Sequence, residues 1–322
     1  MKWKSKLISS SLPLEFEAAK ILVAKGFTIS SDFSYARNDA GVVKDFSVDL
    51  HAMAFLPFTK PQDISSTAKL ELLVECKQRL KDISWLFLPS HRPFFAYNDF
   101  GYALYAEDQF SQLFFPYHAT AYFEKPMCFC YKGTEIDEKN GSVFDAELKH
   151  GIAQLQYALP RLYVERVLED IRYDYATHPF LFCSILVTTA NLFVAHESLV
   201  TADVEKSSSL KDIAHQVPYL IFISDYGPDF KSHCLEEFAP LAKLPNNKII
   251  KSLDGYRKKD VFNKNQMPSS LTISLAEGDR SQLYSRFTHF VICNMQHFPS
   301  LMTHLKRSTT IAVRKLKQLP KL

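Results

Sequence analysis

The sequence predicts an α/β fold, with a mixed central sheet flanked by helices, an aromatic-rich insertion and a C-terminal extension. Three observations predict it. The chain has 322 residues, 47% of them hydrophobic, which is enough to bury a large core. Its first 80 residues show one helical pattern followed by three β-prone runs, and later apolar runs alternate with helical ones. The chain has no internal repeat and no low-complexity segment.

The first helix is expected over residues 13–25. Ser11 and Pro13 favour a helix start, and Glu15 suits the positive end of the helix dipole in the first turn. Gly26 favours the end of the helix.

Three strands should follow this helix, over 27–35, 42–55 and 70–77. A turn at 38–41 separates the first two. The segment 57–66 is rich in Pro, Thr and Ser, so the second and third strands should form an antiparallel hairpin.

Residues 83–143 are expected to interrupt this core as an insertion. They include 16 aromatic residues from Trp85 to Tyr131, without a clean helical or alternating period, and a polar turn at 132–142. Such a cluster is typical of a packed insertion or of an oligomer contact, which makes a homodimer possible. Stacking of nucleobases on the rings is the alternative.

The later elements complete the expected architecture. Helical stretches are expected over 144–158 and 161–175, with Pro160 interrupting them. Strands are expected over 180–187, 191–195, 218–224 and 287–293, and a basic helix over 299–319. We therefore expect a core over residues 1–200 and a C-terminal extension over 201–322 that completes or flanks its sheet.

The net charge of +3 conceals a basic C-terminal end. Residues 280–322 contain eight basic residues and no acidic one. A solvated helix face or a contact with a phosphate backbone explains such a segment equally well. The candidate nucleic-acid-binding residues are Lys306, Arg307, Arg314, Lys315 and Lys317.

Other classes of protein lack support in the sequence. The first apolar stretch is too short for a signal peptide or a membrane span, so we expect a cytoplasmic protein without membrane contact. The six cysteines form no C-x-x-C pair, so neither disulfides nor a zinc site are expected. The chain also lacks the glycine-rich phosphate and dinucleotide loops and the G-x-S-x-G elbow.

Two apolar strands carry charged residues. Asp49 lies in the second strand, and Glu75 and Lys77 lie in the third, where alternation places them on the same face. The antiparallel hairpin would bring the two carboxylates level at its open end. Because burying charge is costly unless the charge is paired or binds a metal, these residues form either a structural ion pair or a reaction site.

This arrangement resembles the PD-(D/E)xK nuclease superfamily, which has the restriction-endonuclease-like fold. The resemblance covers roughly residues 12–80 and 144–196. It depends on the order of the elements and on four short segments: Phe16-Glu17, Gly26-Phe27, Val48-Asp49-Leu50 and Val74-Glu75-Cys76-Lys77-Gln78.

The resemblance implies a Mg²⁺- or Mn²⁺-dependent endonuclease that acts on DNA, with RNA not excluded, and a role in restriction or antiphage defence. Asp49 and Glu75 would hold the metal, since Mg²⁺ prefers hard oxygen ligands. Lys77 would hold or deprotonate the attacking water. Glu17 would touch the metal through water or orient Lys77, and Glu15 is the alternative for this role.

Two further glutamines, Gln154 and Gln156, match the place where related nucleases carry a glutamine near the site, although a surface glutamine is the commoner explanation. The role of Gln78 stays open, because a regular strand would turn it away from Lys77. The alternative function is an inactive module with a nuclease fold that binds nucleic acid or a partner protein.

Overall fold

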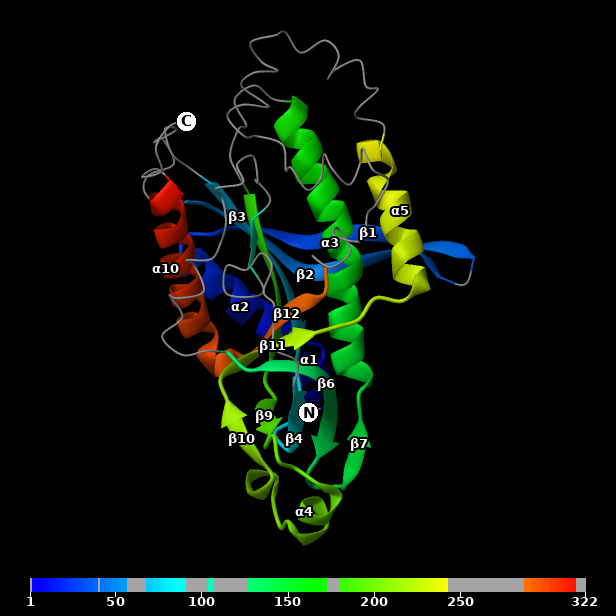
Figure 1. Ribbon diagram of the computed structural model, residues 1–322, viewed down its shortest axis with the longest axis vertical. Coiled ribbons are helices and arrows are strands. Elements are labelled where there is room, and N and C mark those ends of the chain that lie inside the picture. The colour runs from blue at the N-terminus through cyan, green and yellow to red at the C-terminus, as the bar shows by residue number, and fades with distance from the viewer. Residues whose placement is uncertain are drawn as a thin grey trace.

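The structure is a computed structural model. It describes residues 2–39, 41–56, 68–90, 104–106, 127–172, 180–242 and 287–316. These residues form a mixed sheet with helices on both faces (Figure 1). Helices α3 (Ala146–Arg172) and α5 (Pro228–Ala242) cover one face, and α2 (Leu12–Ala24) and α10 (Phe298–Leu316) cover the other. The expected α/β architecture is confirmed at this level.

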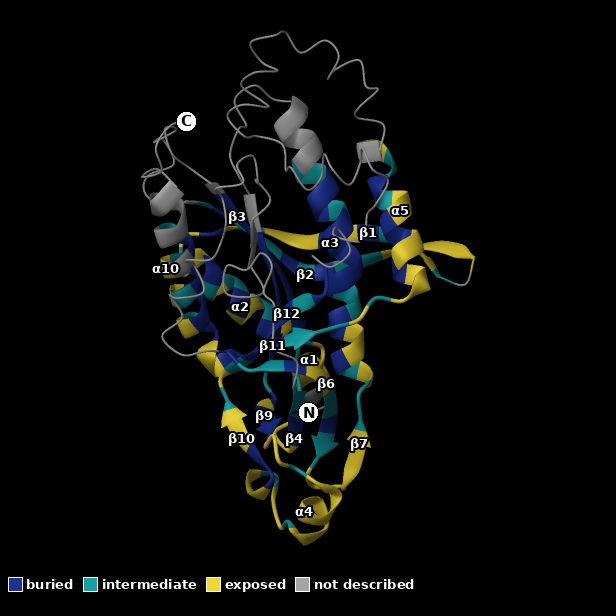
Figure 2. Ribbon diagram, in the orientation of Figure 1, coloured by how far each residue is buried: buried dark blue, intermediate teal, exposed yellow. Residues whose placement is uncertain are grey.

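Each face of the sheet has its own hydrophobic core. The α3-side core contains sheet residues such as Leu73 and Phe182 together with residues of α3 and α5. The α2-side core contains Leu72 and Val74 together with residues of α2 and α10. Successive residues of the third strand thus alternate between two cores, and Figure 2 shows the buried interior between the helices.

The described residues contribute twelve strands to the sheet. Ten follow in the order β1-β2-β3-β8-β12-β11-β6-β4-β9-β10, while β5 pairs with β8 and β7 with β6. The strands are β1 (Thr28–Asp39), β2 (Val42–Leu56), β3 (Ala68–Lys77), β4 (Ile83–Pro89), β5 (Leu104–Ala106), β6 (Phe129–Asp137), β7 (Ser142–Phe144), β8 (Phe180–Thr188), β9 (Asn191–Ala195), β10 (Ala214–Val217), β11 (Tyr219–Ile223) and β12 (His289–Asn294). The shorter helices are α1 (Lys2–Ser9), α4 (Thr201–Lys206), η4 (Leu210–Asp212) and η6 (Met295–His297).

The expected hairpin is confirmed. Strands β2 and β3 pair antiparallel, with Leu50 opposite Val74. On its other side β3 pairs in parallel with β8, as a strand buried on both faces commonly does. Although β3 is buried on both faces, it carries charged residues, and Glu71 and Glu75 are among its buried side chains.

Two expected interruptions are wrong. Helix α3 is continuous and contains Pro160, where a break was expected. A proline inside a helix costs about 3 kcal/mol, and the buried neighbours Leu159, Leu162 and Tyr163 offset this cost by packing in the α3-side core. The polar turn expected at 132–142 is also shorter than expected, because β6 extends to Asp137 and the chain turns only over 138–141.

The expected insertion and extension both belong to the central sheet. Strands β4 and β6 come from the aromatic segment, and β12 lies between β8 and β11. A strand was expected at β12, whereas β4 and β6 were not predicted, because the strands that pair with them lie far away in the sequence. Most of the aromatic segment, including 107–126, lies outside the described residues, so dimerisation through it stays a prediction.

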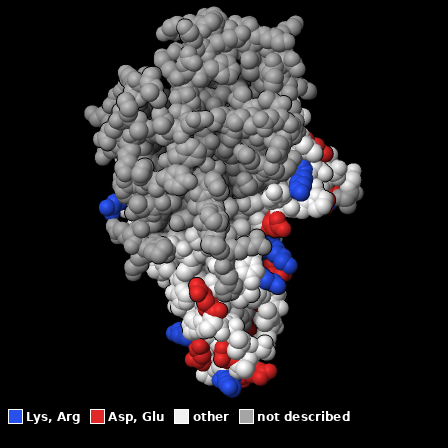
Figure 3. Space-filling view, in the orientation of Figure 1, with Lys and Arg blue, Asp and Glu red and all other residues white. Residues whose placement is uncertain are grey.

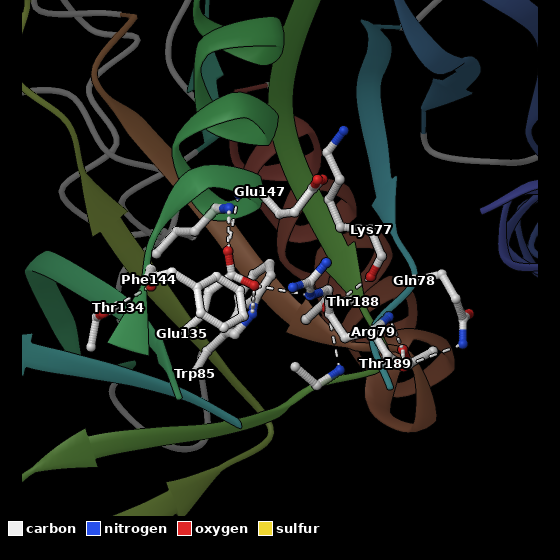
Figure 4. A network of polar contacts seen from close by, with 12 residues as sticks. Lys77, Gln78, Arg79, Trp85, Thr134, Glu135, Phe144, Glu147, Thr188 and Thr189 are labelled. Atoms are coloured by element: carbon white, nitrogen blue, oxygen red, sulfur yellow. Dashed lines mark hydrogen bonds and ion pairs between the residues drawn. The ribbon is translucent and has the colours of Figure 1, made fainter. Parts of the chain in front are cut away.

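Glu135 joins three parts of the fold through a buried polar network (Figure 4). Its side chain is fully buried. One oxygen accepts a hydrogen bond from the indole of Trp85 at 3.0 Å and pairs with Arg79 at 2.9 Å. The other accepts the backbone N–H groups of Glu147 and Leu148, which lie in the first turn of α3. The carboxylate therefore caps α3 and fixes its start beside the end of β3.

Glu135→Ala should lower the free energy of unfolding by about 3–5 kcal/mol, because it leaves Arg79 without its buried counter-charge and uncaps α3. Urea unfolding followed by circular dichroism measures the effect. Glu205→Ala, at an exposed glutamate of α4, is the control and should change stability by less than about 0.5 kcal/mol. Equal small effects in both variants would contradict the structural role of the network.

Candidate functional site

The candidate site lies at the open end of the β2–β3 hairpin. The register that pairs Leu50 with Val74 places Asp49 level with Glu75. The Cys76 backbone N–H donates to Asp49 Oδ2 at 2.7 Å, and the Asp49 backbone N–H donates to Glu75 Oε2 at 3.3 Å. Each strand thus holds the carboxylate of the other, as the hairpin prediction required.

Lys77 completes the cluster. Its ammonium lies 2.7 Å from Glu75 Oε1 and donates to Gln154 Oε1 at 2.9 Å. The amide nitrogen of Gln154 in turn donates to the Ser47 carbonyl at 3.0 Å. Gln154 therefore ties α3 to both strands and fixes the lysine from a second direction.

The other glutamines lie differently. Gln156 donates to the backbone carbonyls of Asp225 and Phe287, so it joins α3 to other parts of the α3-side core. Gln78 contributes its backbone N–H, which donates to Ser11 Oγ at 3.1 Å. That contact joins the start of α2 to the end of β3.

Strands β1 and β2 both change faces at this site. Asp32 has a positive φ of 55°, and the β1–β2 ladder pairs Ser31 with Leu50 and Phe33 with Val48 on either side of it. Val48 packs in the α3-side core and Leu50 in the α2-side core, although regular alternation would place both on one face. The backbone irregularity frees Asp49 from regular pairing at the position where it bonds Cys76.

The structure brings Glu15, rather than Glu17, to the cluster. The buried face of α2 is formed by Leu14, Ala18 and Leu22. At about 100° per residue, Glu15 lies about 60° from the centre of that face and Glu17 about 100°. Glu17 is exposed, whereas partial burial and the nearby charges of Asp49 and Asp32 raise the pKa of Glu15, with Lys77 opposing.

The cluster carries more negative than positive charge. Glu75 is 1% exposed, and its burial raises its pKa to about 7, with Lys77 opposing and Asp49 adding to the rise. Burial also raises the pKa of Asp49, against the hydrogen bond from Cys76. One ammonium does not balance the carboxylates that surround it, so an added cation would be stabilised here.

The donor set fits Mg²⁺ or Mn²⁺. Asp49 and Glu75 offer hard carboxylate oxygens, and Mg²⁺ is commonly held by one or two carboxylates together with waters and substrate oxygens. Among the described residues, no three Asp, Glu, His or Cys side chains form a set that would hold an ion by themselves.

Sequence reasoning missed two residues of α3 near Lys77. Burial and the charge of Lys77 lower the pKa of His150, with Glu147 opposing. A Cβ at Gly151 would lie 2.8 Å from Leu186 Cδ1 and 3.2 Å from Lys77 Cε, so the glycine permits the close approach of α3. The sequence signal for Gly151 was a glycine inside a helical pattern, in a chain that has only nine glycines. No sequence pattern pointed to His150.

The described basic side chains of α10 lie away from this cluster. Lys306 is half-buried and donates to the Lys25 carbonyl at 3.4 Å, at the carboxyl end of α2, and Arg307 is exposed. Because the 13 residues of α2 span about 20 Å, this contact is remote from Ser11 and Gln78. Of the other candidates, the side chains of Arg314 and Lys315 and the whole of Lys317 lie outside the described residues.

No protein-family model, curated protein or solved structure matches this chain. In the described ranges, no helix has an apolar stretch long enough to cross a membrane.

Glu71 provides an internal comparison for Glu75. Both are buried, on the same strand and the same face. Glu71 lies between two basic groups, with His51 Nε2 at 2.7 Å and Arg166 Nε at 3.1 Å. Glu75 instead shares one lysine with a second carboxylate. The first arrangement should stabilise the fold, and the second should destabilise it.

Glu75→Gln should therefore raise stability at pH 8 in EDTA, by on the order of 3 kcal/mol, whereas Glu71→Gln should lower it. The folded state binds more protons than the unfolded state between pH 4.5 and about 7, so the wild type loses stability as pH rises through this window. The advantage of Glu75→Gln should vanish below pH 4.5. Urea unfolding at a series of pH values measures the stability of the wild type and of the two variants. If Glu75→Gln lowered stability at pH 8, Glu75 and Lys77 would form a structural ion pair.

Proposed function

We propose that this protein is a metal-dependent endonuclease that hydrolyses phosphodiester bonds in DNA. The single observation that carries the proposal is the cluster of Asp49, Glu75 and Lys77, aligned at the end of a buried hairpin by reciprocal backbone hydrogen bonds. A buried carboxylate pair with one shared lysine is costly to the fold, which favours a functional role. Restriction or antiphage defence is the role that the nuclease resemblance favours.

Each residue has a part in the proposed reaction. A bound Mg²⁺ would polarise the phosphate and lower the pKa of a bound water. Asp49 and Glu75 supply the carboxylate oxygens for that ion. The Lys77 ammonium, fixed between Glu75 and Gln154, is placed to hold the attacking water and to stabilise charge on the phosphate in the transition state.

Glu15 and His150 extend the cluster from the two helices. Both lie close enough to Lys77 for its positive charge to lower their pKa values. Glu15 is half-buried beside Asp49, so its carboxyl is suited to orient a water toward the carboxylate pair. His150 is exposed at the α3 side of Lys77, and its lowered pKa favours the neutral imidazole, which can accept a proton or a hydrogen bond from substrate.

Asp49→Asn and Glu75→Gln should each weaken Mn²⁺ binding by more than about tenfold, because each removes one of the two carboxylate ligands. Titration calorimetry at pH 8, above the pKa of Glu75, measures the affinity. The control is Asp45→Asn, at an exposed position of the same strand as Asp49. Unchanged affinity in both site variants would refute the metal assignment.

Lys77→Ala should reduce Mg²⁺-dependent cleavage of plasmid DNA by about 10²–10³-fold, because it removes a charge aimed at the transition state. Lys44→Ala is the control, since Lys44 pairs with Asp39 at the far end of the β1–β2 hairpin.

Glu15→Gln should slow cleavage and Glu17→Gln should not. A parallel assay on RNA tests the nucleic-acid preference, and DNA binding without cleavage in the wild type would favour the inactive module.

A further inference from the structure

The chain presents an exposed apolar surface along α1 and the start of α2. Trp3 is 59% exposed and Phe16 is 66% exposed. Large side chains gathered on a surface in this way commonly mark a contact with another molecule. We call this set the α1 surface; its apolar members are Trp3, Leu7, Ile8, Leu12 and Phe16.

The α1 surface is basic along helix α1, whereas its far end at Phe16 lies between Glu15 and the exposed Glu17. Residues 1–14 include three lysines and no acidic residue. At about 100° per residue, Trp3 and Leu7 form a stripe on α1, with Lys4 on one side and Lys6 on the other. The Lys4 ammonium lies 5.8 Å from the centroid of the Trp3 ring. Elsewhere, on the face seen in Figure 3, acidic and basic side chains of the described residues are interleaved.

The α1 surface lies next to the candidate site. Helix α1 ends at Ser9, two residues before Ser11. The Ser11 hydroxyl accepts a hydrogen bond from the backbone N–H of Gln78, which directly follows Lys77. Glu15, one turn further along, is close enough to Asp49 and Lys77 for their charges to affect its pKa. A polymer held at the carboxylates would therefore have its next units beside α1.

We propose that α1 is a DNA-docking element, in which Lys4 and Lys6 contact backbone phosphates and Trp3 packs against sugars or bases beside the scissile bond. The inference rests on the proposed function. An aromatic ring flanked by cations suits a ligand whose stacked bases are flanked by phosphates. The α1 surface lies next to the proposed site of phosphodiester cleavage. This position favours DNA as the ligand, because DNA would also be held at the carboxylates, whereas an anionic membrane or a second copy of the chain would not.

Trp3 makes the proposal directly measurable. The chain has two tryptophans, and Trp85 is fully buried. Acrylamide quenching of tryptophan fluorescence therefore reports Trp3. A 20-base-pair duplex in EDTA, where cleavage is blocked, should protect Trp3 from acrylamide, and the Trp3→Phe variant should lose this signal. Trp3→Ala should weaken duplex affinity by about 5- to 100-fold.

The lysines are tested by salt dependence. Lys4→Ala/Lys6→Ala should flatten the slope of log K against log salt by about 1.8, since each phosphate contact contributes about 0.9. Lys206→Ala/Lys211→Ala, at exposed lysines of the α4 region, is the matched control and should leave the slope unchanged.

The outcomes separate this proposal from the nuclease assignment. Unprotected Trp3 and an unchanged slope, in a wild type that still cleaves DNA, would overturn α1 docking and leave the nuclease proposal standing. Protection by phosphatidylglycerol vesicles but not by duplex would overturn it in favour of a membrane surface. A wild type that neither binds nor cleaves DNA would overturn both.

Discussion

The constraint on which the site depends is the burial of Glu75 beside Asp49 with one shared lysine. Strand β3 is covered by cores on both faces, so the Glu75 carboxylate is almost completely removed from bulk water. Burial raises the pKa of Glu75 to about 7, and the fold retains this cost where an apolar residue would pack better. In our account, the binding of a cation and a phosphodiester offsets it.

The surrounding structure holds this arrangement in place. Reciprocal hydrogen bonds lock the hairpin end, and Gln154 fixes Lys77 from α3. Helix α3 is positioned in turn by the buried Glu135 at its first turn, and Gly151 lets it approach the lysine closely. Strands β2 and β3 and helix α3, which are distant in sequence, thus set the geometry of three contacts: Cys76 to Asp49, Asp49 to Glu75, and Lys77 to Gln154. Such support is what a preorganised site requires.

Sequence patterns predicted what depends on local periodicity. The hairpin, the level carboxylates and the shared face of Glu75 and Lys77 follow from alternation and turn chemistry, and all are present. The sequence does not separate Glu15 from Glu17 because both flank the same apolar stripe, and only the packing of α2 on the sheet leaves Glu15 half-buried and Glu17 exposed. Strands β4 and β6 were missed because the strands that pair with them are far away in the sequence. No pattern within residues 83–143 therefore predicts the pairing.

The most direct test of the central claim is a crystal structure of the protein soaked in Mn²⁺ at pH 8, with anomalous scattering used to place the ion. The account predicts a peak between the carboxylates of Asp49 and Glu75, with waters completing the coordination and Gln154 still holding Lys77. The absence of an anomalous peak at this position, with the Lys77 ammonium still paired with Glu75, would contradict a metal-dependent site and would leave a structural ion pair.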